Sequence, residues 1–471
     1  MTLPPSLIAS APALPQTPRK IWTVGTLSYT TAGLALLFCW LLWGDFAWSM
    51  KDRAIPPIMQ LLFKKFGASD TLAGLLFGSL SPALGLVLGP IISYRSDRHR
   101  GPWGRRIPFL LVSTPIAVLS IIGLAFSPKI GAHFAQWMGP HSWSADATVL
   151  LFLALFWMLF DVATVITNAV YAALINDVVP QPIMGRFYGF FRAFGLIAAI
   201  LFYLGAFGDA ETTYLWIFLG VGALYGVGFT IMCLRVKEGT YPPHLPMDAG
   251  RKTGGFLQSA RTYFQQCFGH RYYWWLFGAL TVAGVATGPV NLFSIFFATS
   301  VHMDKHLYGK CLALTYCISL VLAYPLGWLA DRVHPLRLGI GILILYAAAT
   351  LWGGFFAKDA RMLAIALVAH GVIAGTWATA TASLQQRLLP RAEFAQFASA
   401  GGILGNLSWI ILAPIAGFLL DHLHHDYRYT FFMGSALALA ALAACLILHG
   451  KFMALGGPRH YAAPEPVGPA Q

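Results

Sequence analysis

Long apolar stretches, separated by short polar or proline- and glycine-containing segments, recur along almost the whole chain of 471 residues. Each stretch is long enough to cross a hydrocarbon core of about 30 Å as a helix. A bilayer core offers no water to unpaired backbone groups, so spanning segments of this kind are helical. The pattern predicts an all-α membrane protein with twelve spans, near residues 28–62, 70–94, 107–127, 147–175, 185–207, 213–234, 272–300, 309–330, 338–357, 361–383, 397–420 and 430–450.

The first stretch is longer than a straight crossing requires. It contains the adjacent prolines Pro56 and Pro57, which lack the backbone N–H that a helix interior uses. We expect these prolines to break the helix near its far end.

The loops divide the spans into two groups of six. A polar, basic segment at 235–271 separates an expected N-terminal bundle (24–234) from a C-terminal bundle (272–450). Tails are expected at 1–23 and, rich in proline, at 451–471. Most Lys and Arg of the loops fall on the side of the N-terminus, which predicts that both termini lie in the cytoplasm.

The composition agrees with a membrane protein and argues against a soluble protein, a nucleic-acid-binding protein and a disulfide-rich or zinc-binding protein. Hydrophobic residues make up 57% of the chain and charged residues 10%, whereas a soluble domain has about 25% charged residues. The net charge of +13 is scattered over short loops and does not indicate a nucleic-acid partner. The six cysteines have neither paired nor metal-like spacing, so we expect no disulfide framework and no zinc site. The first 23 residues lack the apolar core of a removable signal peptide.

A charged cluster occupies the loop between the second and third predicted spans. It reads DRHRGPWGRRIP over residues 97–108 and contains Asp97, Arg98, Arg105 and Arg106. Such charges can pair with neighbouring helix ends in one conformation and release them in another. These four residues are candidates for a gating latch, or serve only to orient the loop in the membrane.

The cluster resembles the Gly-x-x-x-Asp-Arg-x-Gly-Arg-Arg element of major facilitator transporters, with Ser93 in place of the first glycine. Its Asp-Arg-x-Arg-x-x-Trp-Gly-Arg-Arg-x-Pro spacing is similar to that of the glycoside-pentoside-hexuronide cation symporters and the related sucrose transporters. The resemblance covers about residues 25–450 at the level of the fold. It implies two pseudo-symmetric six-helix bundles, a central sugar-type site and cation-coupled symport.

The two predicted halves also resemble each other, as the halves of rocking transporters do. Asp331 and Arg332 follow the eighth span as Asp97 and Arg98 follow the second, so they join the gating candidates. A second correspondence has a constant offset of 210 residues, and it relates Pro180, Phe187 and Gly195 to Pro390, Phe397 and Gly405.

One departure from the family pattern indicates which ion is coupled to transport. Sodium-coupled members similar to the melibiose permease carry acidic residues on the second span, and residues 80–92 here have none. A sodium site is built from oxygen ligands such as carboxylates. We therefore expect H⁺ rather than Na⁺ as the coupling ion, with no other cofactor and no bound metal.

Polar residues inside the fourth and fifth spans are the first site candidates. A charged group at the centre of a bilayer costs about 2.5–3.5 kcal/mol even on the most permissive scale, which makes Asp161 the strongest of them. It shares one helix face with Trp157, Thr164, Asn168 and Tyr171, a stripe that lines water or substrate or forms a helix–helix seam. We expect Arg192 to form an ion pair with Asp161, either functional or purely structural.

The first span carries Asp45, Ser49 and Asp52 on one face, beside Lys51 and Arg53. Asp45 resembles the family's acidic residue on this span. Either Asp45 or Asp161 is a candidate to carry the coupled proton, whereas Asp52 is interpreted as a paired or solvated charge.

The second half supplies milder candidates. Sugars bind through hydrogen bonds to their hydroxyls and through stacking on aromatic rings. His370 is either titratable or a neutral hydrogen-bonding residue, and each tryptophan serves substrate or packing. The candidates are Asn291, Ser294, His370, Trp377, Thr381, Asn406 and Trp409.

These observations favour a proton-coupled symporter for a sugar or glycoside that works by alternating access. The alternatives are an exporter or carrier of amphipathic, lipid-like solutes, and a non-transporting membrane sensor. The chain contains no nucleotide-binding loop and no nucleophile with a placed base, so we expect no enzyme. The expected partners are the substrate and the lipid bilayer, the expected state is a monomer, and the expected location is the inner membrane of a bacterium.

Overall fold

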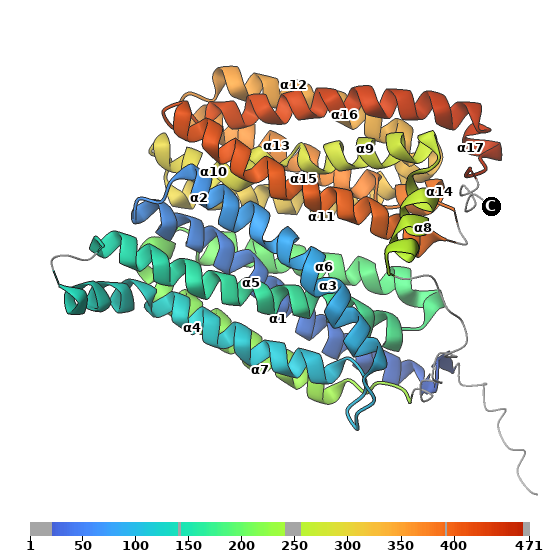
Figure 1. Cartoon of the computed structure of the whole chain (residues 1–471), viewed down its shortest axis with the longest axis horizontal. Coiled ribbons are helices and arrows are strands. Elements are labelled where there is room, and N and C mark those ends of the chain that lie inside the picture. Colours follow the sequence, from blue (N-terminus) through green and yellow to red (C-terminus); the bar gives the residue numbers. More distant parts are fainter. Residues whose placement is uncertain (1–20, 140–142, 241–255, 391–392, 465–471) are drawn as a thin grey trace, which may run out of the picture.

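The computed structural model describes residues 21–139, 143–240, 256–390 and 393–464. Within these residues, twelve helical segments are long and apolar enough to cross a membrane, as the hydrophobic pattern predicts. They form two bundles of six that lie side by side, one blue to green and one yellow to red in Figure 1. The all-α fold is therefore confirmed.

The N-terminal bundle follows a short antiparallel hairpin, which the pattern did not predict, of β1 (Trp22–Val24) and β2 (Leu27–Tyr29). The second span is composite, because a π-helix interrupts it. The bundle consists of α1 (Thr31–Lys65), α2 (Asp70–Ala73) with η1 (Gly74–Ser79) and α3 (Leu80–Arg98), α4 (Ile107–Met138), α5 (Ala145–Val178), η2 (Gln181–Ile183) with α6 (Met184–Gly205), and α7 (Ala210–Arg235).

The C-terminal bundle contains two spans that are helices interrupted by a short turn. The seventh span is interrupted just before Gly288 and Pro289, where Pro289 cannot donate to the preceding turn. The elements are α8 (Phe256–Phe268), α9 (Arg271–Val285) with α10 (Gly288–Ser300), α11 (Lys305–Val333), α12 (Pro335–Phe356), α13 (Ala360–Ala380) with α14 (Leu384–Leu388), α15 (Phe394–His422), α16 (Arg428–Ala454) and α17 (Gly457–His460).

The expected break at Pro56 and Pro57 is wrong, because α1 continues through both prolines to Lys65. Each proline frees the carbonyl four residues earlier, at Asp52 and Arg53. All four residues line a cavity between the two bundles. Freed carbonyls are tolerated in a membrane helix where they face a polar cavity, which explains why the helix continues.

The sequence repeat has a structural counterpart. Pro180 directly precedes the fifth span and Pro390 lies a few residues before α15, and the side chains of Phe187 and Phe397, seven residues on, are both fully buried. The residues related by the offset of 210 thus occupy corresponding places in the two bundles.

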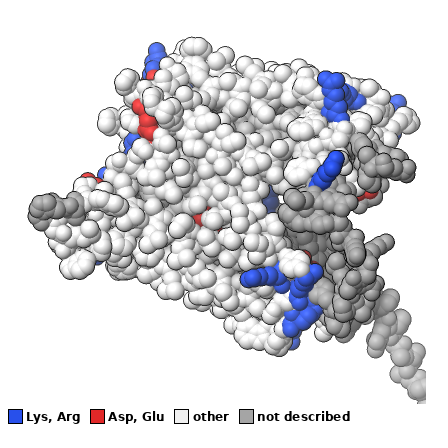
Figure 2. Space-filling model, viewed as in Figure 1, with Lys and Arg blue, Asp and Glu red and all other residues white. Residues whose placement is uncertain are grey.

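Both ends of the described chain lie on one side of the bundles, on the right in Figure 1. We name this the terminal side and the other the distal side. In Figure 2 the charged side chains gather toward the two ends, and the surface between them is almost entirely uncharged. That uncharged band is the surface a bilayer requires.

The two bundles approach each other closely on the distal side, where α15 packs on α2 and η1. Glycines permit this contact. A Cβ atom at Gly74 would collide with the Ala413 carbonyl, and one at Gly417 would collide with the Asp70 carbonyl. Backbone therefore meets backbone across the interface.

Candidate substrate and coupling site

A cavity of about 740 Å³ lies between the two bundles, within the range of small-molecule sites. Its polar lining combines charged, carboxamide and hydroxyl groups with aromatic rings. The polar and aromatic lining residues are Asp52, Arg53, Gln60, Arg192, Tyr203, Thr287, Asn291, Ser294, Tyr308, Thr315, Tyr316, Ser319, His370 and Trp377. Most lining residues belong to the C-terminal bundle. We refer to this as the central cavity.

Four predicted site residues, Arg192, Asn291, His370 and Trp377, line the central cavity, as does Ser294. Asp52, which the sequence analysis interprets as a paired or solvated charge, lines this cavity beside Arg53. Helix periodicity gives the face of α1 that holds them but not which face the other bundle covers.

His370 is part of a hydrogen-bonded chain in the cavity wall. Its Nδ1 lies 2.9 Å from the Tyr346 hydroxyl and its Nε2 lies 3.0 Å from the Asn291 carbonyl oxygen. Because that oxygen only accepts, Nε2 carries a hydrogen and donates it to Asn291. His370 therefore orients the Asn291 carboxamide, whose N–H donors remain for the cavity.

The expected ion pair between Asp161 and Arg192 is wrong. Arg192 instead donates to the Thr379 hydroxyl at 2.6 Å, across the interface between the bundles, and neither Asp161 nor any other acid lies in salt-bridge contact with it in the described structure. Since α6 begins and α13 ends on the terminal side, this hydrogen bond crosses at the terminal-side rim of the central cavity.

Asp161 lies inside the N-terminal bundle and is 5% exposed. Its electrostatic partners are Ser81 on α3 and Lys51 on α1. Within the described residues its Oδ2 atom is buried without a hydrogen-bond partner. The carboxylate predicted to be the principal site residue is thus separated from the central cavity.

Asp45 is also fully buried in the N-terminal bundle. The Ser49 hydroxyl donates to one of its oxygens at 3.5 Å, as their shared helix face predicts. The other oxygen has no hydrogen-bond partner in the part of the chain that the structure describes. Asp45 and Asp161 are therefore two buried acids with unused acceptors.

The stripe on α5 serves several purposes. Trp157 donates to the Leu76 carbonyl at 3.0 Å and Tyr171 to the Leu41 carbonyl at 2.8 Å. The two outer members thus join α5 to neighbouring helices, which is the helix-seam alternative. Thr164, in the middle of the stripe, accepts a hydrogen bond from Lys51.

Asn168, Asn406 and Trp409 lie outside the central cavity. They line a second cavity of about 620 Å³ between α3, α5 and α15. Trp409 also lines a smaller cavity of about 340 Å³, which shares Gly284 with the central cavity. The predicted site residues of the eleventh span thus lie along this row of spaces at the interface, and not in the main site.

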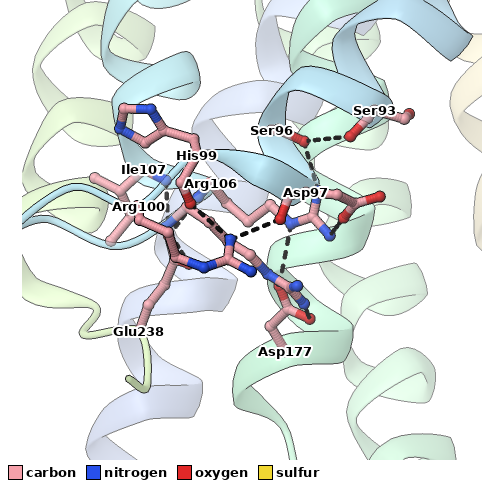
Figure 3. A network of polar contacts seen from close by, with 10 residues as sticks. Ser93, Ser96, Asp97, His99, Arg100, Arg106, Ile107, Asp177 and Glu238 are labelled. Carbon is pink, nitrogen blue, oxygen red and sulfur yellow. Dashed lines mark hydrogen bonds and ion pairs between the residues drawn. The ribbon is translucent and has the colours of Figure 1, made fainter. Parts of the chain in front are cut away.

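Three gating candidates of the first half, Asp97, Arg105 and Arg106, belong to one network on the terminal side (Figure 3). Arg106 pairs with Asp97 and, at 3.1 Å, with Asp177 at the end of α5. Arg105 pairs with the same Asp177. Glu238, just after α7, accepts from the backbone N–H groups of Arg105, Arg106 and Ile107 at 2.8 to 2.9 Å.

This network joins α3, α4, α5 and the end of α7 within one bundle. The acid at the N-terminus of α4 also satisfies N–H groups that a helix leaves unpaired. Sequence analysis named the loop residues but missed Asp177 and Glu238, which only the packing of distant helix ends brings to the loop.

The second half has a simpler counterpart. Asp331 pairs with Arg387, which stands 210 residues after Asp177, so the repeat retains the position but reverses the charge. Arg98 and Arg332 each lie over an aromatic ring one turn earlier, Tyr94 and Trp328, at 3.8 and 3.9 Å from the ring centroids.

A polar cluster joins the two bundles on the distal side, and we name it the distal latch. The buried Asp70 carboxylate accepts from Tyr427 at 2.9 Å and from His425 at 2.7 Å, and Lys64 lies 3.5 Å away. The Asp421 carboxylate in turn accepts from the backbone N–H groups of Asp70 and Thr71 at 2.9 Å. No sequence pattern singled out these residues.

Comparison with known proteins identifies the family. The family described as "MFS/sugar transport protein" matches residues 42–393. The chain belongs to this family. Its solute-transporting members are not enzymes, which agrees with the expectation from the sequence. The resemblance to the major facilitator and sucrose transporter group is thereby confirmed.

Individual proteins with sequence similarity to this chain match it over shorter regions than the family does. Proton-associated sugar transporter A of Homo sapiens is 33% identical over 144 residues, which cover 30% of this chain and 19% of that protein. The sucrose transport protein SUT5 of Oryza sativa subsp. indica is 31% identical over 122 residues, covering 24% and 21%. The chain thus spans about a fifth of the length of these curated relatives.

Solved structures share the fold of this family member over nearly its whole length. A bacterial homolog of the human lysosomal transporter Spinster, inward-facing and unoccupied, has a TM-score of 0.63 at 15% identity and covers 90% of this chain and 99% of its own. The peptide transporter POT in complex with sulfate has a TM-score of 0.62 at 14% identity, covering 92% and 96%. The protein thus has the major facilitator fold, and the described residues contain twelve helical segments long and apolar enough to cross a membrane.

Proposed function

We propose that this protein is a secondary active symporter that couples the movement of protons to the transport of a sugar or glycoside by alternating access. The central cavity is the observation that carries the proposal. Its carboxamide, hydroxyl and guanidinium groups suit the hydroxyls of a sugar, and its tyrosine and tryptophan rings suit the apolar face. Sugar-transporting relatives support the substrate class.

The buried acids support proton coupling. Asp45 and Asp161 each have an oxygen without a hydrogen-bond partner among the described residues, and a protonated carboxyl is far less costly to bury than a carboxylate. A ligand shifts a conformational equilibrium only by binding its two states with different affinity. A proton on Asp161 supplies such a difference, because it removes a charge from the core of one bundle.

The proposed setting is the inner membrane of a bacterium, with the terminal side in the cytoplasm. The excess of loop Lys and Arg on that side supports the orientation. The central cavity is formed by the two bundles of one chain, which supports a monomer as the working unit.

Uptake of radiolabelled mono- and oligosaccharides into proteoliposomes tests the proposal. The liposomes carry an inward proton gradient, an inward sodium gradient or neither. We expect accumulation of at least one sugar with the proton gradient alone. The Asp161→Asn variant is expected to lose accumulation, and Asp146→Asn, at an exposed acid of the same helix, is expected to retain it.

Accumulation driven by sodium would contradict the proposed ion. Transport of no sugar under any gradient would contradict the substrate class and favour a carrier of another solute. Unchanged proton-driven accumulation in Asp161→Asn would remove Asp161 from the coupling role and leave Asp45 as the acid to test.

A further inference from the structure

The side chain of Lys51 is buried completely in the core of the N-terminal bundle. Its ammonium group donates to the Thr164 hydroxyl at 3.0 Å. The rings of Phe160, Tyr225 and Trp48 surround it, with centroids 4.7, 5.5 and 5.6 Å from the nitrogen. Lys51 thus occupies an aromatic cage that stabilises a cation, and it does not line the central cavity.

An ammonium group has three hydrogens to donate, and Thr164 accepts the one hydrogen bond that Lys51 makes within the described residues. A buried charge with so few partners is costly unless a counter-charge compensates it. No carboxylate lies within 4.0 Å of Lys51 in the described part of the chain. Its need for a counter-charge is therefore only partly met in this conformation.

Asp161 is placed to complete the pair. It precedes Thr164 by three residues on α5, so the two side chains lie one turn apart on the same face. Its Oδ2 atom is buried without a hydrogen-bond partner in the described structure, and Lys51 is near enough to interact electrostatically with the ionised form of Asp161. Lys51 thus has unused donors, and Asp161, one turn from Thr164 on the same helix, has an unused acceptor.

We propose that Lys51 is the resident counter-cation of Asp161, and that its ammonium moves from the Thr164 hydroxyl to the Asp161 carboxylate when Asp161 releases the coupled proton. The O–H bond of Asp161 breaks, the proton leaves to water, and Lys51 remains protonated throughout. The core then changes from one positive charge, held by the aromatic cage, to a neutral ion pair. This proposal rests on the proposed role of Asp161 in proton coupling.

The other groups that face the pair do not replace Lys51. Asp52 is its neighbour on α1 and interacts with both members, but it lies in the wall of the central cavity next to Arg53. Tyr225 on α7 contributes a ring face, and Ser81 on α3 is a neutral partner of Asp161. Lys51 is a positioning residue, since it acts through the acid and not on the substrate.

A double-mutant cycle on the purified full chain in nanodiscs tests the pairing without any transport assay. The melting temperature is measured over a range of pH for Lys51→Met, Asp161→Asn and the double variant, because the pair forms only after Asp161 has released its proton. Removing one member of a buried pair leaves a charge uncompensated, whereas removing both does not. We expect the double variant to lose less stability than the sum of the single losses. Additive losses at every pH would overturn the pairing.

A transport readout tests the proton-linked movement. Without Lys51, Asp161 retains its proton. We therefore expect Lys51→Met to lose proton-driven accumulation of sugar but to retain sugar counterflow. The rate of counterflow should no longer depend on pH. Lys51→Arg, which preserves the charge, is expected to retain part of the accumulation. Lys129→Met, at an exposed lysine near the Phe126 ring, is the matched control.

Accumulation by Lys51→Met with the pH profile of the unmodified protein would overturn the proposal. Failure of the unmodified protein to accumulate any sugar with protons would instead contradict the proposed function, and the stability cycle would still decide whether the two residues are paired.

Discussion

His334 joins α11 to α12 at a backbone φ of 84° and accepts the Leu336 N–H as the cap of α12. Burial, reinforced by the positive charges of Arg387 and Arg337, lowers the pKa of His334 to about 4. In the unfolded chain a histidine binds its proton near pH 6.5. Below about pH 6.5 the unfolded chain therefore binds a proton at His334, whereas the folded protein binds this proton only near pH 4. The free energy of unfolding thus decreases as the pH falls from about 6.5 to about 4.

We expect His334→Asn to remove this acid sensitivity, because asparagine caps a helix and does not titrate. Melting temperatures at pH 7.5 and pH 5 check it: the drop should be smaller in the variant than in the unmodified protein. His133→Asn, on an exposed part of α4, should behave like the unmodified protein. Equal drops in all three would contradict the assignment.

Single residues were predictable from the sequence in identity but not in partnership. Asp161 was recognised because an acid in an apolar stretch is costly. The predicted ion pair between Asp161 and Arg192 is wrong, because Arg192 donates to Thr379 on the other bundle. The cation that contacts α5 is instead Lys51, which extends from α1 to Thr164. Helical spacing gives the face of a residue and contains no information on which helix packs against that face.

At the level of the elements, the start of the second span carries the contacts that are expected to keep the distal side closed. The distal latch joins α2 to the loop between α15 and α16, and Asp70 holds three donors of the two bundles. A hydrogen bond that involves a charged group contributes about 1.5–3 kcal/mol. Asp70→Asn should therefore favour opening of the distal side by about tenfold, since 1.4 kcal/mol corresponds to a factor of ten.

Accessibility of the central cavity measures this shift. In a background without native cysteines, Asn291→Cys is alkylated by a membrane-impermeant reagent added from the distal side. Asp70→Asn should accelerate the reaction. Asp426→Asn, which removes an acid paired with Arg428 in the same loop, should not. Equal rates in both variants would show that the latch does not control access.

The elements were predicted well in number and approximate bounds, and less well in their interruptions. Apolar length determines where a span lies, so all twelve were found. The turn before Gly288 and the continuation of α1 through Pro56 and Pro57 were missed. The effect of a proline depends on what faces the freed carbonyl, and for α1 this is a cavity created by the other bundle.

For the whole molecule, the two bundles contribute unequally. Most of the wall of the central cavity comes from the C-terminal bundle, whereas the buried Asp45, Lys51 and Asp161 all lie in the N-terminal bundle. We expect Asn291→Ala to raise the KM for the sugar by about two- to tenfold, the loss of one neutral hydrogen bond. The number of protons moved per sugar should not change.

Kinetics and reversal-potential measurements in proteoliposomes check both expectations. Ser300→Ala, on the same α10 but beyond the cavity lining, serves as the control. A changed proton-to-sugar ratio in Asn291→Ala would contradict a separation of the two tasks between the bundles.

This inequality has an evolutionary consequence. In the proposed mechanism, substrate recognition depends mainly on the C-terminal bundle, and proton coupling depends mainly on the N-terminal bundle. Mutations in the C-terminal bundle can therefore change the substrate of such a transporter while its proton coupling is preserved. We therefore expect related transporters with different substrates to differ first at the C-terminal residues that line the central cavity, such as Asn291 and Trp377.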